Sequence, residues 1–210
     1  LMCAPIASAN QLCPLVDAAN VLVVGPGLGQ AAWGRSLLSA AANGQQVQVW
    51  DADALNLLAA GQIVLPADAV LTPHPGEAAR LLGCSTSQVQ SDRPAAAREL
   101  AQRYQAVIVL KGAGTLIAGP QGQLAVCSNG HPAMAGAGFG DVLAGVIGAL
   151  LAQGLPSYAA ACLAVWLHAR AGEQLASYGR GMAASDLLPA IREQLEAFAP
   201  APVTMRTLDI

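Results

Sequence analysis

The sequence has little charge for its length and no concentration of positive charge. Charged residues make up 11% of the 210 residues, and 10 Lys plus Arg stand against 13 Asp plus Glu, which leaves a formal net charge of -3. Surfaces that bind nucleic acid need clustered Lys and Arg to contact the phosphate backbone. We therefore expect no nucleic-acid partner, and any anionic ligand must be bound by a local arrangement of groups.

Long hydrophobic runs are also absent, although hydrophobic residues make up 54% of the chain and exclude intrinsic disorder. The two most apolar stretches, residues 142–152 and 159–169, are shorter than the roughly 20 residues that a membrane-spanning helix needs. They predict buried helices and no membrane association.

The five cysteines form no CxxC pair. This spacing favours reduced thiols that pack as small buried side chains in a cytoplasmic protein, without a zinc site.

Short β-branched segments alternate with helical segments along the chain. The predicted strands are residues 21–24, 47–50, 69–71, 107–110, 115–118 and 123–127, and the last two form a hairpin. The predicted helices are a short segment after residue 51 and residues 30–43, 75–82, 93–104, 142–153, 159–178 and 184–198. This alternation predicts one α/β domain with a largely parallel sheet covered by helices on both faces.

Five glycine-rich or acidic loops follow the predicted strands or open the predicted helices. Their sequences are GPGLG, DAD, TPHPGE, KGAGT and GAGFGD. In an open parallel sheet, the loops at the carboxyl ends of the strands gather around the ligand site. The pattern therefore predicts that all five loops meet in one crevice.

The loop GAGFGD carries the sharpest chemical signal. Gly136, Gly138 and Gly140 allow the backbone to approach an anion, and the helix that begins near Asp141 offers free N–H groups and a positive dipole end. A phosphate fits such a cradle. Asp141 either caps the helix or accepts a proton from a hydroxyl group that attacks phosphorus. The loop alone does not decide between these two roles.

Two further loops also have alternative interpretations. Lys111 is the only lysine in the chain, and the segment from Lys111 to Thr115 offers backbone N–H groups, a hydroxyl and a cation to a nucleotide, or else is a turn with a solvated lysine. GPGLG begins like a Rossmann fingerprint, with Asp51 near the ribose-binding distance, but Gln30 occupies the third glycine position. The alternative is a glycine turn that admits a ligand close to the backbone.

His74 and Glu77 lie in TPHPGE, between a strand and a helix. A single histidine beside prolines is more often a structural hydrogen-bonding group than a catalyst, and the helix dipole favours a glutamate in a first turn. Glu77 and Asp51 are the candidate ligands of a metal ion. Hydrated Mg²⁺ near phosphates needs only one or two carboxylates, which it can contact through water.

Taken together and in order, five segments resemble the ADP-dependent NAD(P)H-hydrate dehydratase family, a branch of the ribokinase-like superfamily. They are VVGPGLGQ, WDADALNLLA, LTPHPGEAARLLG, VLKGAGTLIA and GHPAMAGAGFGDVLAGVIGALLAQG, and the resemblance covers about residues 12–195. It implies a ribokinase-like three-layer α/β/α sandwich and a cytoplasmic lyase, often a homotetramer. The implied reaction repairs the S form of hydrated NADH or NADPH with ADP, or ATP, and Mg²⁺, and yields NAD(P)H, AMP and phosphate.

The resemblance also implies roles for individual residues. Gly27 and His74 would contact the hydrated dinucleotide, and Asp141 would contact it as the catalytic base. The nucleotide would be bound by residues of two loops. These are Lys111, Gly112, Ala113, Gly114 and Thr115 of the KGAGT loop, and Gly138 and Gly140 of the GAGFGD loop.

The sequence departs from the family pattern at three points. The family's domain normally begins with a further strand and helix ahead of the position of Leu1, so we expect residues 1–210 to form a single nucleotide-binding domain that is incomplete at its N-terminus. His131 stands where the family usually has Asn. Phe139 stands where Ser, Thr or Met is common, and its bulk is expected to narrow the anion pocket. An NAD(P)H-hydrate epimerase domain, often fused ahead of this one in bacteria, is the expected partner.

Two other functions would use the same motifs. A ribokinase-like small-molecule kinase, for example one that acts on a vitamin precursor, would share the GAGFGD loop and release a stable phosphorylated product. A non-catalytic nucleotide-binding subunit of the same fold would bind nucleotide without turnover. Analysis of the products formed with ADP or ATP separates the three.

Overall fold

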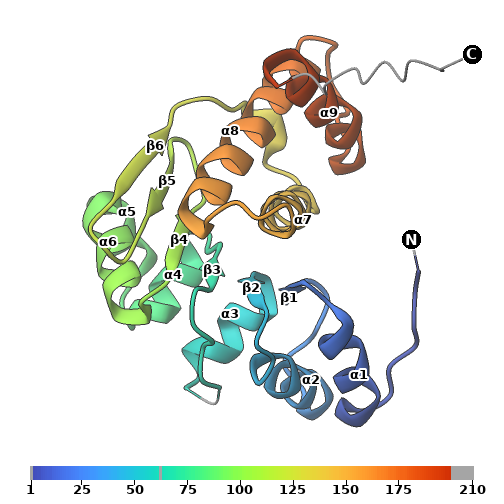
Figure 1. Ribbon diagram of the computed structural model, residues 1–210. Coiled ribbons are helices and arrows are strands. Elements are labelled where there is room, and N and C mark those ends of the chain that lie inside the picture. The colour runs from blue at the N-terminus through green and yellow to red at the C-terminus, as the bar shows by residue number, and fades with distance from the viewer. Residues whose placement is uncertain (1, 62, 200–210) are drawn as a thin grey trace, which may run out of the picture.

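A six-stranded sheet forms the centre of the molecule. The computed structural model describes residues 2–61 and 63–199 (Figure 1). The strands are β1 (Val21–Val24), β2 (Val47–Trp50), β3 (Val70–Leu71), β4 (Val107–Leu110), β5 (Thr115–Ala118) and β6 (Leu124–Cys127). They lie in sequence order across the sheet, with β1 to β4 mutually parallel and β5 antiparallel to both β4 and β6. The predicted strands and hairpin are confirmed to within one residue at each end.

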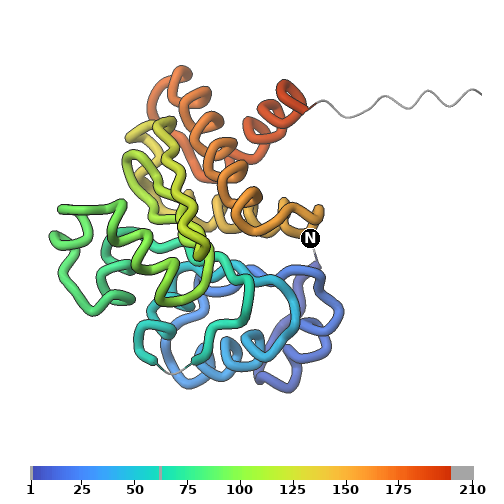
Figure 2. Tube along the Cα trace, turned by 60° about the vertical axis from the view of Figure 1, so that its left-hand side comes forward, coloured from blue at the N-terminus to red at the C-terminus, as the bar shows by residue number. Residues whose placement is uncertain are grey.

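Helices cover both faces of this sheet. On one face pack α7 (Phe139–Ala152) and α8 (Ser157–Ala176), with α9 (Leu187–Phe198) against α8. On the other face lie α2 (Ala32–Ala42), α3 (Ala52–Ala59), α4 (Pro75–Leu82), α5 (Thr86–Ser91) and α6 (Arg93–Tyr104). Figure 2 shows the orange and red helices on one side of the strands and the green and cyan helices on the other. The predicted three-layer α/β/α sandwich is confirmed.

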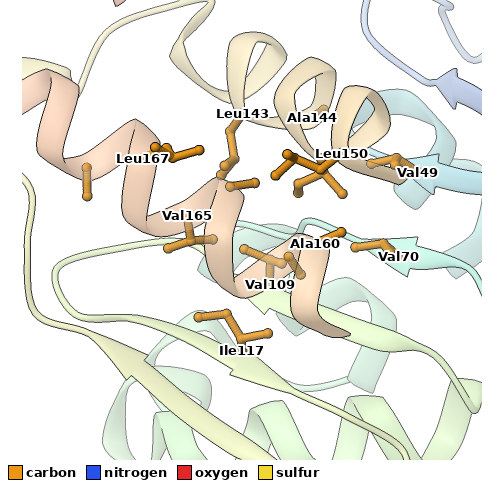
Figure 3. Close-up of a cluster of buried hydrophobic side chains, with 14 of the residues drawn as sticks. Val49, Val70, Val109, Ile117, Leu143, Ala144, Leu150, Ala160, Val165 and Leu167 are labelled. Atoms are coloured by element: carbon orange, nitrogen blue, oxygen red, sulfur yellow. The ribbon is translucent and has the colours of Figure 1, made fainter. Parts of the chain in front are cut away.

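Alternate side chains of the inner strands, β2 to β5, enter two separate cores, as the period of a β-strand requires. One set faces α7 and α8 (Figure 3): Val49, Val70, Val109 and Ile117. The other set packs with α3, α4 and α6: Trp50, Leu71, Ile108 and Leu110. Burial on both faces explains why the strands are continuous apolar runs, and it fixes the strand register. The loops at the strand ends are therefore held at defined positions.

Two helices of the structure are missing from the sequence prediction. α1 (Ala9–Ala18) packs on α2, buries only Val16 and contains Pro14, a residue that is unfavourable inside a helix. α5 is polar, buries only Val89 and is capped by Ser85. The last predicted helix also begins later, at Leu187, after a 3-10 turn. A helix with an internal proline, a short polar helix and a 3-10 turn are features that hydrophobic periodicity does not predict.

The cysteines agree only in part with the expectation of buried thiols. All five are free; Cys127 is buried, and Cys84 and Cys162 are half-buried, but Cys3 and Cys13 are exposed. The two most apolar stretches lie inside α7 and α8, as predicted. Across the described ranges, no helix combines the length and the hydropathy needed to cross a membrane.

Candidate functional site

The carboxyl ends of the parallel strands lie side by side at one edge of the sheet. The backbone N–H of Asp51, after β2, donates to Val24 O at the end of β1 over 3.1 Å. The backbone N–H of Lys111, after β4, donates to Pro73 O after β3 over 2.9 Å. These hydrogen bonds extend the sheet order into the loops, so the side chains that follow the strands are brought together.

A buried ion pair joins two of these loops. Lys111 Nζ lies 2.7 Å from Asp51 Oδ1, and the same oxygen accepts the Thr72 hydroxyl at 2.7 Å. Glu77 Oε2 lies 3.9 Å from the ammonium. Asp51 is 2% exposed and Glu77 5% exposed, so the charges of this cluster are largely removed from water. Such burial is tolerated only because the charges are paired and hydrogen-bonded.

The first turn of α7 packs directly on this ion pair. A β-carbon built on Gly140 would lie 3.3 Å from Lys111 Nζ and 3.6 Å from Asp51 Oδ2. A side chain at this position would press on the ammonium, and glycine removes that obstacle. The structure thus brings together the loops that contain GAGFGD, KGAGT, TPHPGE and DAD.

Asp141 projects from the first turn of α7 without an internal partner. Gly138 is the N-cap, with φ of 84°, and Asp141 is the third helical residue after it. The carboxylate is exposed, and it makes no hydrogen bond or ion pair with any residue that the structure describes. The capping interpretation is therefore wrong, because a glycine occupies the cap. The carboxylate remains available to a ligand, at a helix end that stabilises negative charge.

The phenyl ring of Phe139 lies in the core and not in the anion cradle. The residue is 5% exposed, and its ring lies where a β-carbon on Gly136 would meet it at 3.1 Å. The ring packs beside Gly136 of the GAGFGD loop, and an effect of its bulk on the anion pocket stays a prediction. Phe139 O accepts a hydrogen bond from His168 Nε2 at 2.9 Å, and burial lowers the pKa of His168. A half-buried histidine thus fixes the start of α7.

α8 also contacts residues 130–134, the segment that leads into the GAGFGD loop. The carboxylate of Glu173 accepts the backbone N–H of Gly130 at 2.9 Å, and this hydrogen bond is the main reason that the pKa of Glu173 is lowered. Met134 packs over Gly172, where a β-carbon would collide with the methionine sulfur. His131 Nδ1 accepts the backbone N–H two residues further on at 3.2 Å. His131 therefore caps the turn that precedes the glycine loop.

The KGAGT loop turns its hydroxyl and its cation inward. Thr115 Oγ1 donates to Gly112 O at 3.0 Å, and Lys111 is held in the ion pair. The sequence analysis missed Arg93, the first residue of α6, whose guanidinium donates to carbonyl oxygens of this loop and whose pKa is lowered by burial. Gly112 and Ala113 are exposed. A nucleotide would therefore meet backbone groups here rather than the threonine hydroxyl.

His74 caps α4. Its Nδ1 accepts the backbone N–H groups of Gly76 at 3.0 Å and Glu77 at 3.3 Å, while Glu77 Oε2 accepts the His74 backbone N–H at 2.8 Å. This is a capping box with histidine as the acceptor, so the structural role considered for His74 is confirmed. Because Nδ1 accepts these hydrogen bonds, Nε2 is the ring donor, and it lies 3.5 Å from Glu77 Oε1. The side chain is 50% exposed, so a ligand can still reach it.

The GPGLG loop contains glycines that are needed for different reasons. Gly25 has φ of +125°, and a β-carbon on it would lie 1.8 Å from the carbonyl oxygen of Asp51. Packing against the neighbouring loop therefore requires this glycine, whether or not a ligand is present. A β-carbon on Gly27 would meet nothing within 4 Å. Open space for a ligand thus exists at Gly27.

The Rossmann interpretation of this loop is wrong. The strands run in sequence order across the sheet, whereas the order of a Rossmann sheet reverses at its first strand. Asp51, expected at ribose distance, is buried in the ion pair. Gln30 donates to Asp53 over 2.9 Å, and this hydrogen bond is the main reason that the pKa of Asp53 is lowered. Gln30 therefore ties the loop to α3.

Asp51 and Glu77 do not fit as direct metal ligands. The Lys111 ammonium lies 2.7 Å from one carboxylate and 3.9 Å from the other, so a second cation in contact with them would be repelled. Among residues 2–61 and 63–199, no group of three or more His, Cys, Asp and Glu side chains is arranged to hold a metal ion. Contact with a hydrated Mg²⁺ through water stays a prediction.

The chain matches proteins of one family along most of its length. The sequence profile of a family described as NAD(P)H-hydrate dehydratase matches residues 1–193. The bifunctional NAD(P)H-hydrate repair enzyme Nnr of Coxiella burnetii is 47% identical over 194 residues, which cover 91% of this chain and 40% of that protein. The chain therefore spans less than half of the length of this relative.

Two solved structures share the fold. A ribokinase-like superfamily protein from Enterococcus faecalis superposes with a TM-score of 0.83 at 30% identity, over 91% of this chain and 68% of that one. The ADP/ATP-dependent NAD(P)H-hydrate dehydratase from Bacillus subtilis, co-crystallised with ATP and Mg²⁺, superposes with a TM-score of 0.72 at 31% identity, over 84% and 65% respectively. The predicted ribokinase-like architecture is confirmed.

Proposed function

This chain belongs to the NAD(P)H-hydrate dehydratase family, and from that membership we propose that it restores NADH or NADPH from its S hydrate with ADP, releasing AMP and phosphate. The observation that carries the proposal is the Asp141 carboxylate, exposed and unpartnered within the described ranges, on a helix turn packed against the Lys111 ammonium. The test is the return of NAD(P)H absorbance when the protein and ADP are added to the purified S hydrate.

Two sets of loops would bind two ligands. The nucleotide would lie against the backbone of residues 111–115 and of Gly138 and Gly140, with the Lys111 ammonium offsetting phosphate charge. The hydrated dinucleotide would contact three residues: Gly27, His74 and Asp141. The open space at Gly27 and the exposed half of the His74 side chain support this assignment. We propose that Mg²⁺ enters with the nucleotide phosphates, as the co-crystallisation of the Bacillus subtilis protein with ATP and Mg²⁺ suggests.

Asp141 would act in the first of two chemical steps. It accepts the proton of the substrate hydroxyl while the hydroxyl oxygen attacks the terminal phosphorus of ADP; the new O–P bond forms and AMP leaves. Phosphate then departs with the C–O bond electrons, and the adjacent carbon loses a proton, which restores the double bond. The Lys111 ammonium and the N–H groups at the start of α7 offset the charge that develops on the phosphoryl oxygens.

The kinase and the non-catalytic alternatives are less well supported, since the Coxiella burnetii relative and the Bacillus subtilis structure are both named for hydrate repair or dehydration. The name of the Coxiella burnetii relative, a bifunctional repair enzyme, supports the proposal that an epimerase domain accompanies this one in a longer protein. Homo-oligomer formation, a tetramer in particular, and a cytoplasmic location also remain predictions.

ADP with Mg²⁺ should raise the melting temperature of the protein. A ligand that binds only the native state stabilises it by roughly 2.7 kcal/mol at about 100 times its dissociation constant. Differential scanning fluorimetry with ADP, ATP and matched Mg²⁺ alone measures the effect. Identical melting curves in all of these solutions, at saturating nucleotide, would contradict the nucleotide site.

His74→Asn should weaken hydrate binding by roughly 2- to 10-fold, the usual worth of one hydrogen bond, and leave the ADP-induced shift unchanged. Asparagine is also a good N-cap, so this variant removes Nε2 while keeping an acceptor for the backbone of α4. His74→Ala loses the cap as well, and should unfold about 1 kcal/mol more easily. Parallel titrations with hydrate and ADP test this. Equal weakening of both ligands in His74→Asn would remove His74 from the substrate site.

A further inference from the structure

The Arg93 guanidinium gathers the carbonyl groups of the KGAGT loop on one side. It donates to Leu110 O at 3.2 Å, Lys111 O at 3.4 Å, Ala113 O at 3.1 Å and Gly114 O at 3.2 Å. The planar guanidinium carries five N–H donors, which allows one side chain to reach several acceptors at once. A single residue outside the loop thus determines the orientation of most of its peptide groups.

Peptide planarity converts this arrangement into outward-facing donors. In a trans peptide, the N–H of one residue points opposite to the C=O of the residue before it. Ala113 O faces Arg93, so the N–H of Gly114 faces away from it; Lys111 O also faces Arg93, so the N–H of Gly112 faces away and donates to Thr115 Oγ1 at 3.3 Å. The N–H of Gly114 has no hydrogen-bond partner in the described part of the chain. The loop therefore presents one unpaired donor on the side away from Arg93.

We infer that Arg93 is the positioning residue of the nucleotide site: it holds the loop so that the N–H group of Gly114 faces the nucleotide phosphates and the carbonyl oxygens bound to Arg93 do not. This inference rests on the nucleotide-binding part of the proposed function. An outward backbone N–H attracts a phosphate, whereas outward carbonyl oxygens would repel it. Arg93 acts through the loop and touches neither reacting atom.

Two further features fit this role. A β-carbon on Gly112 would lie 2.5 Å from Arg93 Nη1, so the loop closes tightly on the guanidinium. No carboxylate in the described ranges pairs with Arg93, and Asp92 instead accepts the backbone N–H of Ala95 at 2.9 Å. No acidic side chain in the described ranges therefore neutralises the positive charge of Arg93. This charge lies next to the loop that we propose binds the nucleotide phosphates.

Arg103 provides a matched control on the same helix. Its Nη1 donates to two carbonyl oxygens at the end of α4, those of Leu81 at 3.0 Å and Leu82 at 3.2 Å. The chemistry of the contact is the same as at Arg93, although Arg103 is more exposed. Arg103 also pairs with Glu99 at 2.8 Å, and the segment that it contacts, the end of α4, is not part of the KGAGT loop.

The experiment compares Arg93→Met, Arg93→Lys and Arg103→Met in the complete protein, by calorimetric titration with ADP and Mg²⁺ and by thermal unfolding. Both Arg93 variants should raise the ADP dissociation constant by about 10- to 100-fold, because hydrogen bonds from a charged group are stronger than those between neutral groups. A lysine ammonium cannot replace the planar guanidinium, whose N–H groups reach several carbonyl oxygens at once. Their affinity for the hydrate should change by less than about 2-fold, because hydrate binds other loops. Arg103→Met should melt earlier with unchanged ADP affinity.

Chemical rescue distinguishes positioning from general stability. Guanidinium chloride at a concentration far below the denaturing range should recover part of the ADP affinity of Arg93→Ala, and sodium chloride of the same concentration should not. An Arg93→Met protein that binds ADP like wild type would overturn the inference, as would equal loss of ADP affinity in Arg103→Met. Wild-type protein that binds ADP but never restores NAD(P)H would refute the proposed reaction alone. Wild-type protein without ADP affinity would refute both.

Discussion

Asp141→Asn should lower turnover of the hydrate by about 10²- to 10⁴-fold, the usual contribution of a general base. This corresponds to roughly 2.7 to 5.4 kcal/mol of transition-state stabilisation. The amide is almost the same size as the carboxylate but cannot accept the hydroxyl proton. Rates are measured from NAD(P)H absorbance under saturating ADP and hydrate, so that the loss appears in kcat.

The stability of Asp141→Asn separates catalysis from folding. The carboxylate has no partner among the described residues, so its removal costs only the helix-dipole interaction, about 0.3 to 1 kcal/mol. ADP affinity should be retained or improved, because a negative charge beside the phosphates is lost. Asp17→Asn makes the same chemical change at an exposed position on α1 and should leave the rate unchanged. Near wild-type turnover in Asp141→Asn would remove Asp141 as the base.

Lys111→Met should lower the free energy of unfolding by about 3 kcal/mol and abolish ADP binding. Breaking a buried pair by removing one partner leaves an uncompensated charge. Here the Asp51 carboxylate, 2% exposed, would lose its cation and keep only the Thr72 hydroxyl as a donor. Urea unfolding followed by circular dichroism measures the stability, and calorimetry measures ADP binding.

Adding Asp51→Asn to Lys111→Met separates the two effects. The double variant removes the Asp51 charge that Lys111→Met leaves without its cation, and only the more distant Glu77 carboxylate still lacks the ammonium, so it should regain at least about 1 kcal/mol relative to Lys111→Met. It should not regain ADP binding, since the cation that faces the phosphates is still missing. Wild-type stability in Lys111→Met would show that the buried ion pair does not form.

The sheet and the meeting of its loops are predictable from sequence for a physical reason. Short apolar segments such as Val107–Leu110 are buried on both faces, and parallel strands place their following loops at one edge. Which side chains pair with one another at that edge is harder to predict. Asp51 and Lys111 lie far apart in sequence, and only their shared position directly after a strand, with opposite charge, hints at the ion pair.

Local hydrogen bonding accounts for most of what the sequence analysis missed. The spacing from His74 to Glu77 is that of a capping box, but with histidine in place of serine or threonine the pattern is easily overlooked. Arg93 gave no signal, because an arginine at the first position of a helix is unremarkable until the loop that it contacts is placed. Asp141 was ambiguous because a cap position depends on backbone angles, and here Gly138 has the angle that makes it the cap.

The most direct test of the account is to measure AMP and restored NAD(P)H in the same reaction, with purified S hydrate, ADP and Mg²⁺. The account predicts one AMP for each NAD(P)H restored by the wild-type protein, and formation of both products about 10²- to 10⁴-fold more slowly with Asp141→Asn. AMP formed together with a stable phosphorylated hydrate, or NAD(P)H restored without any AMP, would contradict it.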